Sequence, residues 1–367
     1  MSLVRFSDLN WQYNQIKKGL LDEIELVLES GSYTSGKNVA LLEKNYAIYC
    51  HQKFAIGVNS GTSALHAGMA AMGIGPGDEV IVPSHTFIAS VNAIILTGAT
   101  PVLVDIDKNG LLDPVSTLSA INEYTKAVMP VHLYGSLVSE NLLKELYAKG
   151  VPVIEDASQA HGARFPSGLS VGAYGKFTAF SFYPGKNLGA AGEAGIVTTD
   201  DDALAKKVFH FRNWGAEIRY QHDTFGLNYR MDEIQALILN RKLAHLDKWN
   251  VLRTEIANFY TPEMNNLSIE VVNNESGACV YHQYVISVTD RDDLKKYLQK
   301  EGIETLIHYP IPVHKQIGVK GNFKSFGTLK NTEALTERIL SLPIYPGLDL
   351  EKAKLVINNI SDFYAKR

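Results

Sequence analysis

The chain has 367 residues, of which 46% are hydrophobic and 20% are charged, and its formal net charge is −4. This length exceeds what one simple core needs, so we expect a large domain and a smaller one. The small negative charge, without any run of five like charges, argues against nucleic acid or an anionic membrane surface as a partner.

The apolar stretches and the cysteines narrow the class of protein further. The longest apolar stretches, such as residues 91–96, fall far short of the roughly 20 residues that span a bilayer. No basic region followed by an apolar one begins the chain, so we predict no signal peptide. Cys50 and Cys279 lie far apart, and neither has metal-ligand spacing around it. We therefore expect a cytoplasmic protein with reduced thiols and no bound metal.

The first half of the chain predicts helices followed by alternating strands and helices. An amphipathic pattern predicts a helix over 7–30, and a second helix follows over 38–49. Helices at 63–72 and 88–97 then separate apolar segments. The predicted strands are 54–58, 79–83, 100–105, 127–132 and 151–156. Strands that are apolar on both faces and alternate with helices indicate a largely parallel sheet, whose working residues gather at the carboxyl ends of the strands.

The second half departs from this alternation. Two strands, 177–182 and 194–199, flank a polar loop, and a long helix is predicted over 232–259. We interpret that helix as the connector between a large domain, residues 1–249, and a smaller C-terminal α+β domain, residues 250–367. The smaller domain contains a predicted strand at 284–288, a helix at 292–301 and a terminal helix after Asp349.

A lysine and an aspartate stand at the ends of two of these strands. Lys186 lies in the loop after strand 177–182, and Asp156 ends strand 151–156. Pyridoxal phosphate (PLP) chemistry requires such a pair, because a lysine amine forms a Schiff base with the cofactor aldehyde and an aspartate keeps the pyridine nitrogen protonated. Either residue alone is weak evidence, since a lysine after a glycine is usually a solvated loop residue.

Small and hydroxyl residues at the start of helix 63–72 suggest an anion site. Gly61, Thr62 and Ser63 follow a strand and open a helix, where backbone N–H groups can bind the cofactor phosphate. An ordinary helix N-cap is the alternative. The glycines at 73–77 lack the spacing of a dinucleotide fingerprint, and Gly185-Lys186 lacks the spacing of a P-loop.

Three more residues have a possible role beside a bound cofactor. Phe87 follows the end of strand 79–83, where its ring either stacks on a pyridine ring or fills the core. The Ser181 hydroxyl, five residues before Lys186, is close enough in sequence to join the phosphate site. The Gln159 amide, three residues after Asp156, is suited to bond the phenolic oxygen of the cofactor; Gln159 and Ser181 are otherwise routine polar residues.

Together these motifs resemble the DegT/DnrJ/StrS family of nucleotide-sugar aminotransferases, over essentially the whole chain. The segments that carry the resemblance are 59–65, 83–87, 155–163, 181–187 and 226–236. The resemblance implies the α/β architecture of fold-type I PLP-dependent aminotransferases, with a mostly parallel sheet in the large PLP-binding domain. It also implies a homodimer with active sites shared between subunits, and glutamate as the amino donor.

The resemblance assigns a role to each matching residue. Lys186 would be the Schiff-base lysine, Asp156 the partner of the pyridine nitrogen, Gln159 the contact of the ring hydroxyl and Phe87 the stacking ring. The residues that would bind the phosphate are Gly61, Thr62, Ser63, Ser181 and, from the other subunit, Asn228.

Segments 306–314 and 211–220 resemble the branch that aminates C3 of dTDP-linked 3-keto-6-deoxyhexoses, in deoxysugar biosynthesis for lipopolysaccharide O-antigen or S-layer glycans. This resemblance implies that Tyr183, His308 and Tyr309 line the hexose site. Arg219 and Tyr220 would come from the neighbouring subunit, with Arg219 facing the diphosphate. Two alternatives remain open. His308 and Tyr309 would otherwise cover the core, and the substrate would otherwise be a dTDP-, UDP- or GDP-4-keto-6-deoxyhexose aminated at C4.

The same scaffold also serves two other functions. Sugar dehydratases of this broad family use a histidine in place of the Schiff-base lysine, and Lys186 argues against that function. A non-catalytic regulator would need a DNA-reading module, but the sequence shows no basic patch and no evident helix-turn-helix.

Overall fold

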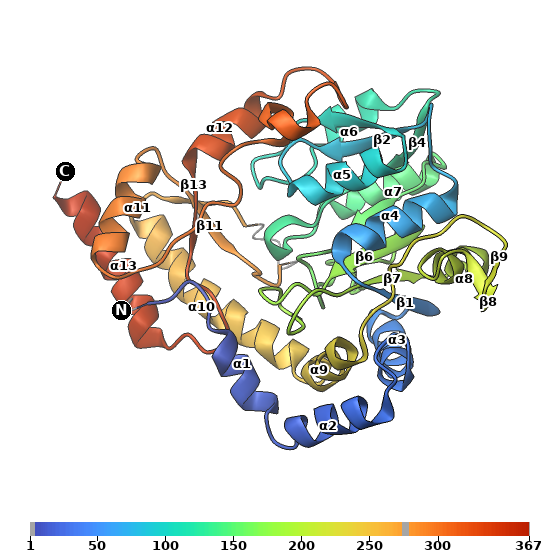
Figure 1. Cartoon of the computed structure of the whole chain (residues 1–367). Coiled ribbons are helices and arrows are strands. Elements are labelled where there is room, and N and C mark those ends of the chain that lie inside the picture. The colour runs from blue at the N-terminus through green and yellow to red at the C-terminus, as the bar shows by residue number, and fades with distance from the viewer. Residues whose placement is uncertain (1–3, 274–278, 367) are drawn as a thin grey trace.

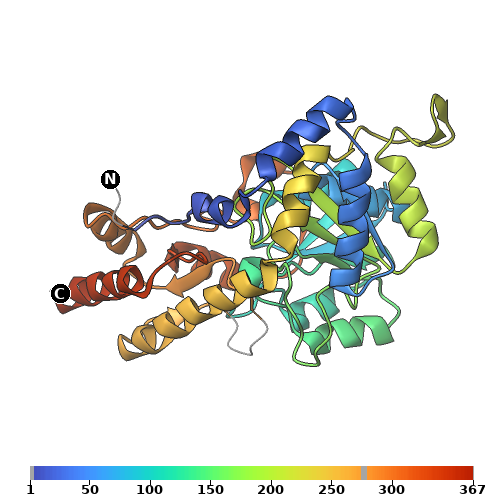
Figure 2. The same cartoon turned by 90° about the horizontal axis from the view of Figure 1, so that it is seen from below.

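Two hydrophobic cores organise the chain. The computed structural model describes residues 4–273 and 279–366, and shows the larger core around a central sheet and the smaller one at the end where both termini lie (Figure 1). The long helix α10 (Leu246–Asn266) runs from one towards the other (Figure 2). The boundary between residues 249 and 250 remains a prediction.

The central sheet combines two hydrogen-bonded ladders. Their strand orders are β1-β7-β6-β5 and β12-β3-β2-β4, and parallel bridges Val128↔Val153 and Val131↔Asp156 join them between β4 and β5. Only β7 runs antiparallel to its sheet neighbours, so the described sheet is mostly parallel, as predicted. The strands are β1 (Phe54–Val58), β2 (Glu79–Pro83), β3 (Thr100–Val104), β4 (Thr125–Val128), β5 (Ile154–Asp156), β6 (Phe177–Ser181), β7 (Gly195–Thr199) and β12 (Lys324–Ser325).

Helices cover this sheet and extend from it. Those of the first 243 residues are α1 (Leu9–Ile16), α2 (Leu20–Ser30), α3 (Lys37–Cys50), α4 (Gly61–Met72), α5 (Ile88–Leu96), α6 (Pro114–Ala120), α7 (Glu140–Ala148), α8 (Asp202–Phe211) and α9 (Glu233–Leu243). A short hairpin, β8 (Ala216–Ile218) and β9 (Gln221–His222), projects away from the body (Figure 2). Within the described part of the chain, no helix combines the length and apolar character needed to cross a membrane.

Two predicted helices are each divided in the structure. The helix expected over 7–30 is two helices, because Gly19 takes a left-handed φ of 71° that a continuing helix does not allow. The helix expected over 232–259 is α9 followed by α10, with a turn at Ala244 and His245 that redirects the chain towards the smaller core. The apolar stripe is continuous in sequence, and periodicity alone does not reveal such a turn.

The smaller core packs helices on a three-stranded antiparallel sheet. Its strands are β10 (Glu270–Val271), β11 (Tyr284–Ser287) and β13 (Ile339–Leu342), and α10, α11 (Arg291–Lys300) and α13 (Leu350–Ala365) supply its helical layer. The N-terminal Val4 is buried in the same core.

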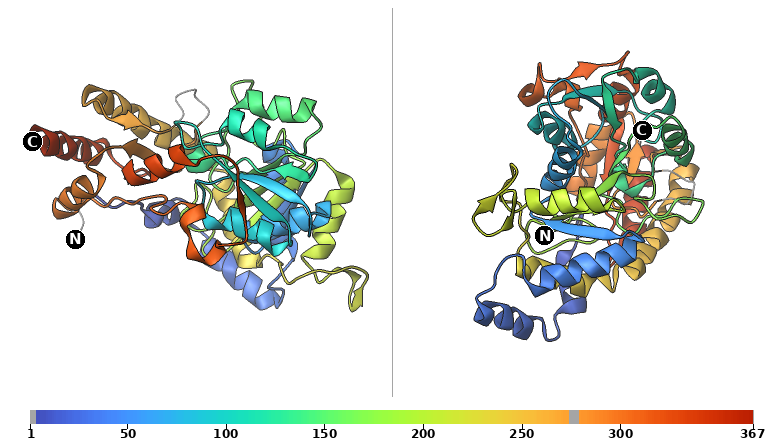
Figure 3. Two further views of the ribbon diagram at one scale, coloured as in Figure 1. Left: turned by 90° about the horizontal axis from the view of Figure 1, so that it is seen from above. Right: turned by 90° about the vertical axis from the view of Figure 1, so that its right-hand side faces the viewer.

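Between α11 and β13 the chain returns to the larger core. This segment includes the short turns at Val313–Lys315 and Ile317–Val319, strand β12 and helix α12 (Lys330–Arg338). Strand β12 pairs in parallel with β3 at the edge of the central sheet (Figure 3). Helix α12 begins next to Asp105, which follows β3, and also contacts β11 of the smaller sheet. The sequence pattern did not predict this return of the chain. It brings residues from the last fifth of the chain to the carboxyl ends of β2 and β3.

Candidate active site

Lys186 lies in a loop that its neighbour Asn187 fixes. The Asn187 amide donates to the Asn250 side-chain oxygen and to the Val280 carbonyl, each at 2.9 Å. Its oxygen lies 3.2 Å from Nδ1 of His282. Because Asn187 is almost completely buried, these three contacts hold the loop between α10 and the entry to β11. No local sequence pattern predicts this role, since the partners of Asn187 are 63 to 95 residues away along the chain.

The Lys186 amine is less basic than an ordinary lysine. The residue is half-buried, and desolvation of its amine lowers its pKa to about 8, although the nearby negative charge of Asp156 raises it. An amine of lowered pKa is a nucleophile at near-neutral pH. The parallel pairing of β5 with β6 places the strand ends that precede Lys186 and contain Asp156 side by side.

Three histidines share the surroundings of Lys186. Burial, and then the Lys186 charge, lower the pKa of His161 to about 3 and that of His308 to about 4. The same causes lower the pKa of His282 well below its ordinary value. These three imidazoles, whose pKa values the Lys186 charge helps to lower, are therefore neutral at physiological pH. Of the three, only His308 was predicted as a site residue.

The Asp156 carboxylate is held in a fixed orientation at the end of β5. One oxygen accepts from the Ser90 hydroxyl at 2.7 Å, and the other accepts from the Ser158 backbone N–H at 3.1 Å. The Ser90 hydroxyl in turn lies 2.9 Å from that of Thr86. Ser90 was not predicted; it lies in the first turn of α5, four residues after Thr86, which precedes the helix.

Hydrogen bonds also fix the Gln159 side chain. Its oxygen accepts from the Tyr134 backbone N–H at 2.6 Å, so its NH₂ group must face the other way, where it donates to the Tyr309 hydroxyl at 3.2 Å. Burial raises the pKa of Tyr309 to about 12, with a further contribution from Asp156, so the phenol stays protonated. The second N–H of Gln159 is available for a ligand.

The predicted phosphate site forms where β6 meets the start of α4. A Cβ at Gly61 would lie 2.6 Å from the Cβ of Ser181, so only glycine permits this close approach. The first N–H groups of α4 have no partner within the helix. Thr62 is half-buried beside them, whereas the Ser63 N–H and hydroxyl are already bonded to Ser60 and Asn59. A phosphate contact of Ser63 therefore remains a prediction that would require these bonds to change.

The aromatic rings of Phe87 and Tyr309 lie close to each other. Phe87 begins α5 with 52% of its surface exposed, so it is not a core residue, and its ring centroid lies 5.5 Å from that of Tyr309. Tyr309 packs partly against the larger core, as the alternative interpretation expected, but its hydroxyl reaches Gln159. His308 lies 2.9 Å from the Ser341 hydroxyl through Nδ1, and its carbonyl accepts from the Tyr134 hydroxyl.

The remaining predicted residues lie outside this buried group. Tyr183 is exposed on the Lys186 loop, and the Asn228 side chain is exposed, although its carbonyl accepts from Asn59. Arg219 and Tyr220 form the tip of the β8–β9 hairpin, with the guanidinium 4.9 Å from the Tyr220 ring centroid. The Lys186 backbone N–H donates to the Tyr183 carbonyl at 2.9 Å. Among the described residues, no side-chain hydrogen bond joins any of these four residues to Lys186 or Asp156.

Comparison with known proteins identifies the class to which this fold and site belong. The sequence profile of the DegT/DnrJ/EryC1/StrS aminotransferase family matches residues 14–361, and the chain belongs to that family. Its members are PLP-dependent enzymes, so the predicted family, fold class, enzyme class and cofactor are confirmed.

Individual relatives are similar over nearly their full lengths. A dTDP-3-amino-3,4,6-trideoxy-alpha-D-glucose transaminase of Streptomyces venezuelae is 42% identical, with 98% of this chain and 96% of the relative covered. A dTDP-3-amino-3,6-dideoxy-alpha-D-galactopyranose transaminase of Aneurinibacillus thermoaerophilus is 41% identical, with 98% and 99% covered. The solved structure of S. venezuelae DesV in complex with a ketimine intermediate superposes with a TM-score of 0.95 at 41% identity and complete coverage of both chains.

Proposed function

We propose that this enzyme transfers an amino group from glutamate to the C3 keto group of a dTDP-linked 3-keto-6-deoxyhexose. The observation that carries the proposal is the placement of Asp156 and Lys186 after two adjacent parallel strands, β5 and β6, at the carboxyl edge of the sheet, where the Asp156 charge acts on the Lys186 amine. Support for C3 comes from the relatives described above, both named for 3-amino sugars linked to dTDP. Amination at C4 is the second candidate.

The residues present fit PLP. The narrow junction of Gly61 and Ser181 at a helix start suits a phosphate, and the oriented carboxylate of Asp156 suits a protonated pyridine nitrogen. The free N–H of Gln159 suits the phenolic oxygen, and the exposed Phe87 ring suits stacking on the cofactor. These assignments, together with Thr62, Ser63 and Asn228 at the phosphate, are part of the proposal.

Each residue has a definite task in the proposed reaction. Bound PLP supplies an electron sink and carries the amino group between the two half-reactions. The Lys186 amine would hold the cofactor through its aldehyde and would move the proton at Cα of the donor. Asp156 would keep a proton on the pyridine nitrogen, and the hydrogen bond from Ser90 fixes the orientation of this carboxylate.

The sugar site in this proposal extends outward from the cofactor. Tyr183, His308 and Tyr309 contact the hexose, and the neutral imidazole of His308 can donate or accept a hydrogen bond there. Arg219 and Tyr220 of a second copy contact the diphosphate and nucleotide. A homodimer with shared sites, a cytoplasmic location and a role in surface glycan biosynthesis belong to the same proposal.

An absorbance spectrum of the purified protein tests this function. The cofactor band is expected to change when glutamate is added and to return when the 3-keto sugar, dTDP-3-keto-6-deoxyglucose, follows. Return with dTDP-4-keto-6-deoxyglucose alone would keep the enzyme class and move the amination to C4. A band that never responds to glutamate would contradict the proposed donor.

A further inference from the structure

The segment that carries His308 and Tyr309 crosses from the smaller core onto the larger one. We call residues 306–316 the strap. Its Leu306 pairs with Ser341 in the smaller core, whereas its Val313 is buried in the larger core and donates from its N–H to the Ser84 carbonyl at 3.1 Å. The strap therefore spans both cores directly over the end of β2.

Helix α12 is fixed to the same sheet edge by a buried carboxylate. Asp105 follows β3 with only 6% of its surface exposed. Its two oxygens accept from the N–H groups of Asn331 and Thr332, at 2.9 and 2.8 Å, and from the Thr332 hydroxyl at 2.9 Å. A negative charge at these N–H groups caps the positive end of the helix, and no residue of α12 itself provides such a cap.

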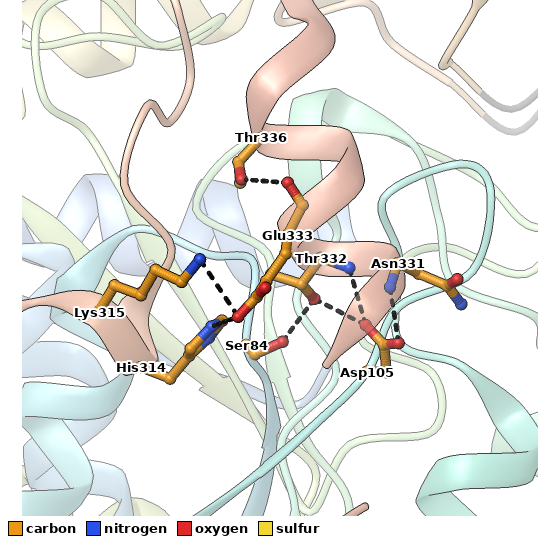
Figure 4. Close-up of polar contacts among 8 residues, drawn as sticks. All are labelled: Ser84, Asp105, His314, Lys315, Asn331, Thr332, Glu333 and Thr336. Carbon is orange, nitrogen blue, oxygen red and sulfur yellow. Dashed lines mark hydrogen bonds and ion pairs between the residues drawn. The ribbon is translucent and has the colours of Figure 1, made fainter. Parts of the chain in front are cut away.

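The first turn of α12 also holds the far end of the strap. One carboxylate oxygen of Glu333 lies 3.0 Å from Nε2 of His314 and 3.2 Å from Nζ of Lys315. Figure 4 shows these contacts beside those of Asp105. Thr332 and Glu333 are consecutive residues, and Thr332 bonds Asp105 whereas Glu333 bonds His314. The Ser84 hydroxyl lies 2.5 Å from the Thr332 hydroxyl, so the residue that bonds Val313 of the strap also bonds α12.

We propose that Asp105 and Glu333 are positioning residues for sugar binding, which act through α12 on the strap. Asp105 fixes the helix, Glu333 fixes residues 314 and 315, and the strap then holds Tyr309 against Gln159 and His308 against Ser341. In this proposal, neither carboxylate touches the sugar itself. The inference rests on the proposed function, because it assigns His308 and Tyr309 to the hexose site.

Glu333 is partly exposed, so its removal should have a modest and selective effect. Glu333→Ala is expected to raise KM for the keto sugar about three- to five-fold, as for loss of an exposed ion pair, and to leave kcat and KM for glutamate nearly unchanged. Glu333→Gln, which keeps an acceptor for His314, should restore part of the loss. Glu145→Gln is the matched control, because it removes another exposed lysine pair, Lys149–Glu145 on α7, far from the strap.

Hydrogen–deuterium exchange of peptides covering 306–316 provides a second readout that does not depend on turnover. Exchange there should rise in Glu333→Ala and remain unchanged in Glu145→Gln. Asp105→Asn, which replaces one acceptor oxygen, should raise exchange in both α12 and the strap. If Asp105→Asn does not fold, the Glu333 variants still test whether α12 positions the strap.

Two results would overturn the proposal. One is unchanged sugar KM and strap exchange in Glu333→Ala; the other is an equal rise of KM for both substrates together with a lower Tm, which would indicate a merely structural role. A wild-type protein that transaminates neither sugar would contradict the proposed function instead, and the exchange data would then decide the strap alone.

Discussion

The inner and outer parts of the candidate active site differ in how many contacts their side chains make within one chain. The inner part consists of Asp156, Gln159 and Lys186. Hydrogen bonds orient the first two side chains, and the charge of Asp156 acts on the Lys186 amine. The outer part includes Arg219 and Tyr220, and Tyr220 exposes 79% of its surface at the tip of a projecting hairpin. Burial and hydrogen bonding thus orient the inner side chains within the chain, whereas Arg219 and Tyr220 are exposed on the hairpin.

The largest expected effect comes from removing the inner amine. Lys186→Ala should lower transamination by at least about 10³-fold, because it removes both the cofactor attachment and the group that moves the Cα proton. Single-turnover measurements with glutamate would check this. Circular dichroism and noncovalent PLP binding serve as controls for the fold and the cofactor site. Turnover at the wild-type rate would refute the central assignment.

A second inner variant should leave the fold intact and slow the reaction. Asp156→Asn removes the charge that holds a proton on the pyridine nitrogen, and we expect a loss of about 10²-fold in kcat. Ser90→Ala is the graded control, because it removes only the hydrogen bond that orients this carboxylate and should cost much less. Similar kcat values for Asp156→Asn and wild type would show that the pairing is not catalytic.

The outer part can be tested by combining subunits. Arg219→Ala should raise KM for the keto sugar about ten-fold by removing a charged contact to the diphosphate, with little effect on the glutamate half-reaction. Mixed dimers of Arg219→Ala with Lys186→Ala sharpen the test. If Arg219 serves the neighbouring site, one site in each mixed dimer regains both wild-type residues, and low-KM activity returns on mixing. If activity does not return, Arg219 does not act across the subunits.

The same division explains what sequence reasoning predicted. The strand ends that place Asp156 and Lys186 follow from apolar segments alternating with helices, and the parallel order of β5 beside β6 brings them together. The supporting contacts were not predictable, because Asn187 bonds Asn250 and His282, and Glu333 bonds His314, through tertiary proximity that no local pattern encodes. The return of the chain from the smaller core to the edge of β3 was missed for the same reason.

The smallest expected effect is a pH dependence of stability in the cofactor-free protein. Desolvation lowers the pKa of Lys186 from 10.5 to about 8, so the folded state binds fewer protons than the unfolded state between these values. The buried charge therefore lowers the free energy of unfolding by its full amount below pH 8. This destabilisation disappears as pH rises towards 10.5. Lys186→Met should be more stable than wild type at pH 7, on the order of 2 kcal/mol, and the gap should close towards pH 10.

Thermal unfolding of cofactor-free wild type and Lys186→Met across this range measures the gap, and the outer region supplies the control. Arg219 is exposed on the hairpin, so Arg219→Ala should change Tm equally little at pH 7 and pH 10. A constant difference between wild type and Lys186→Met over the whole range would mean that the amine is not desolvated in the folded protein. In that case desolvation would not distinguish Lys186 from the exposed residues of the outer part. The inner and outer parts would then differ only in their hydrogen bonding.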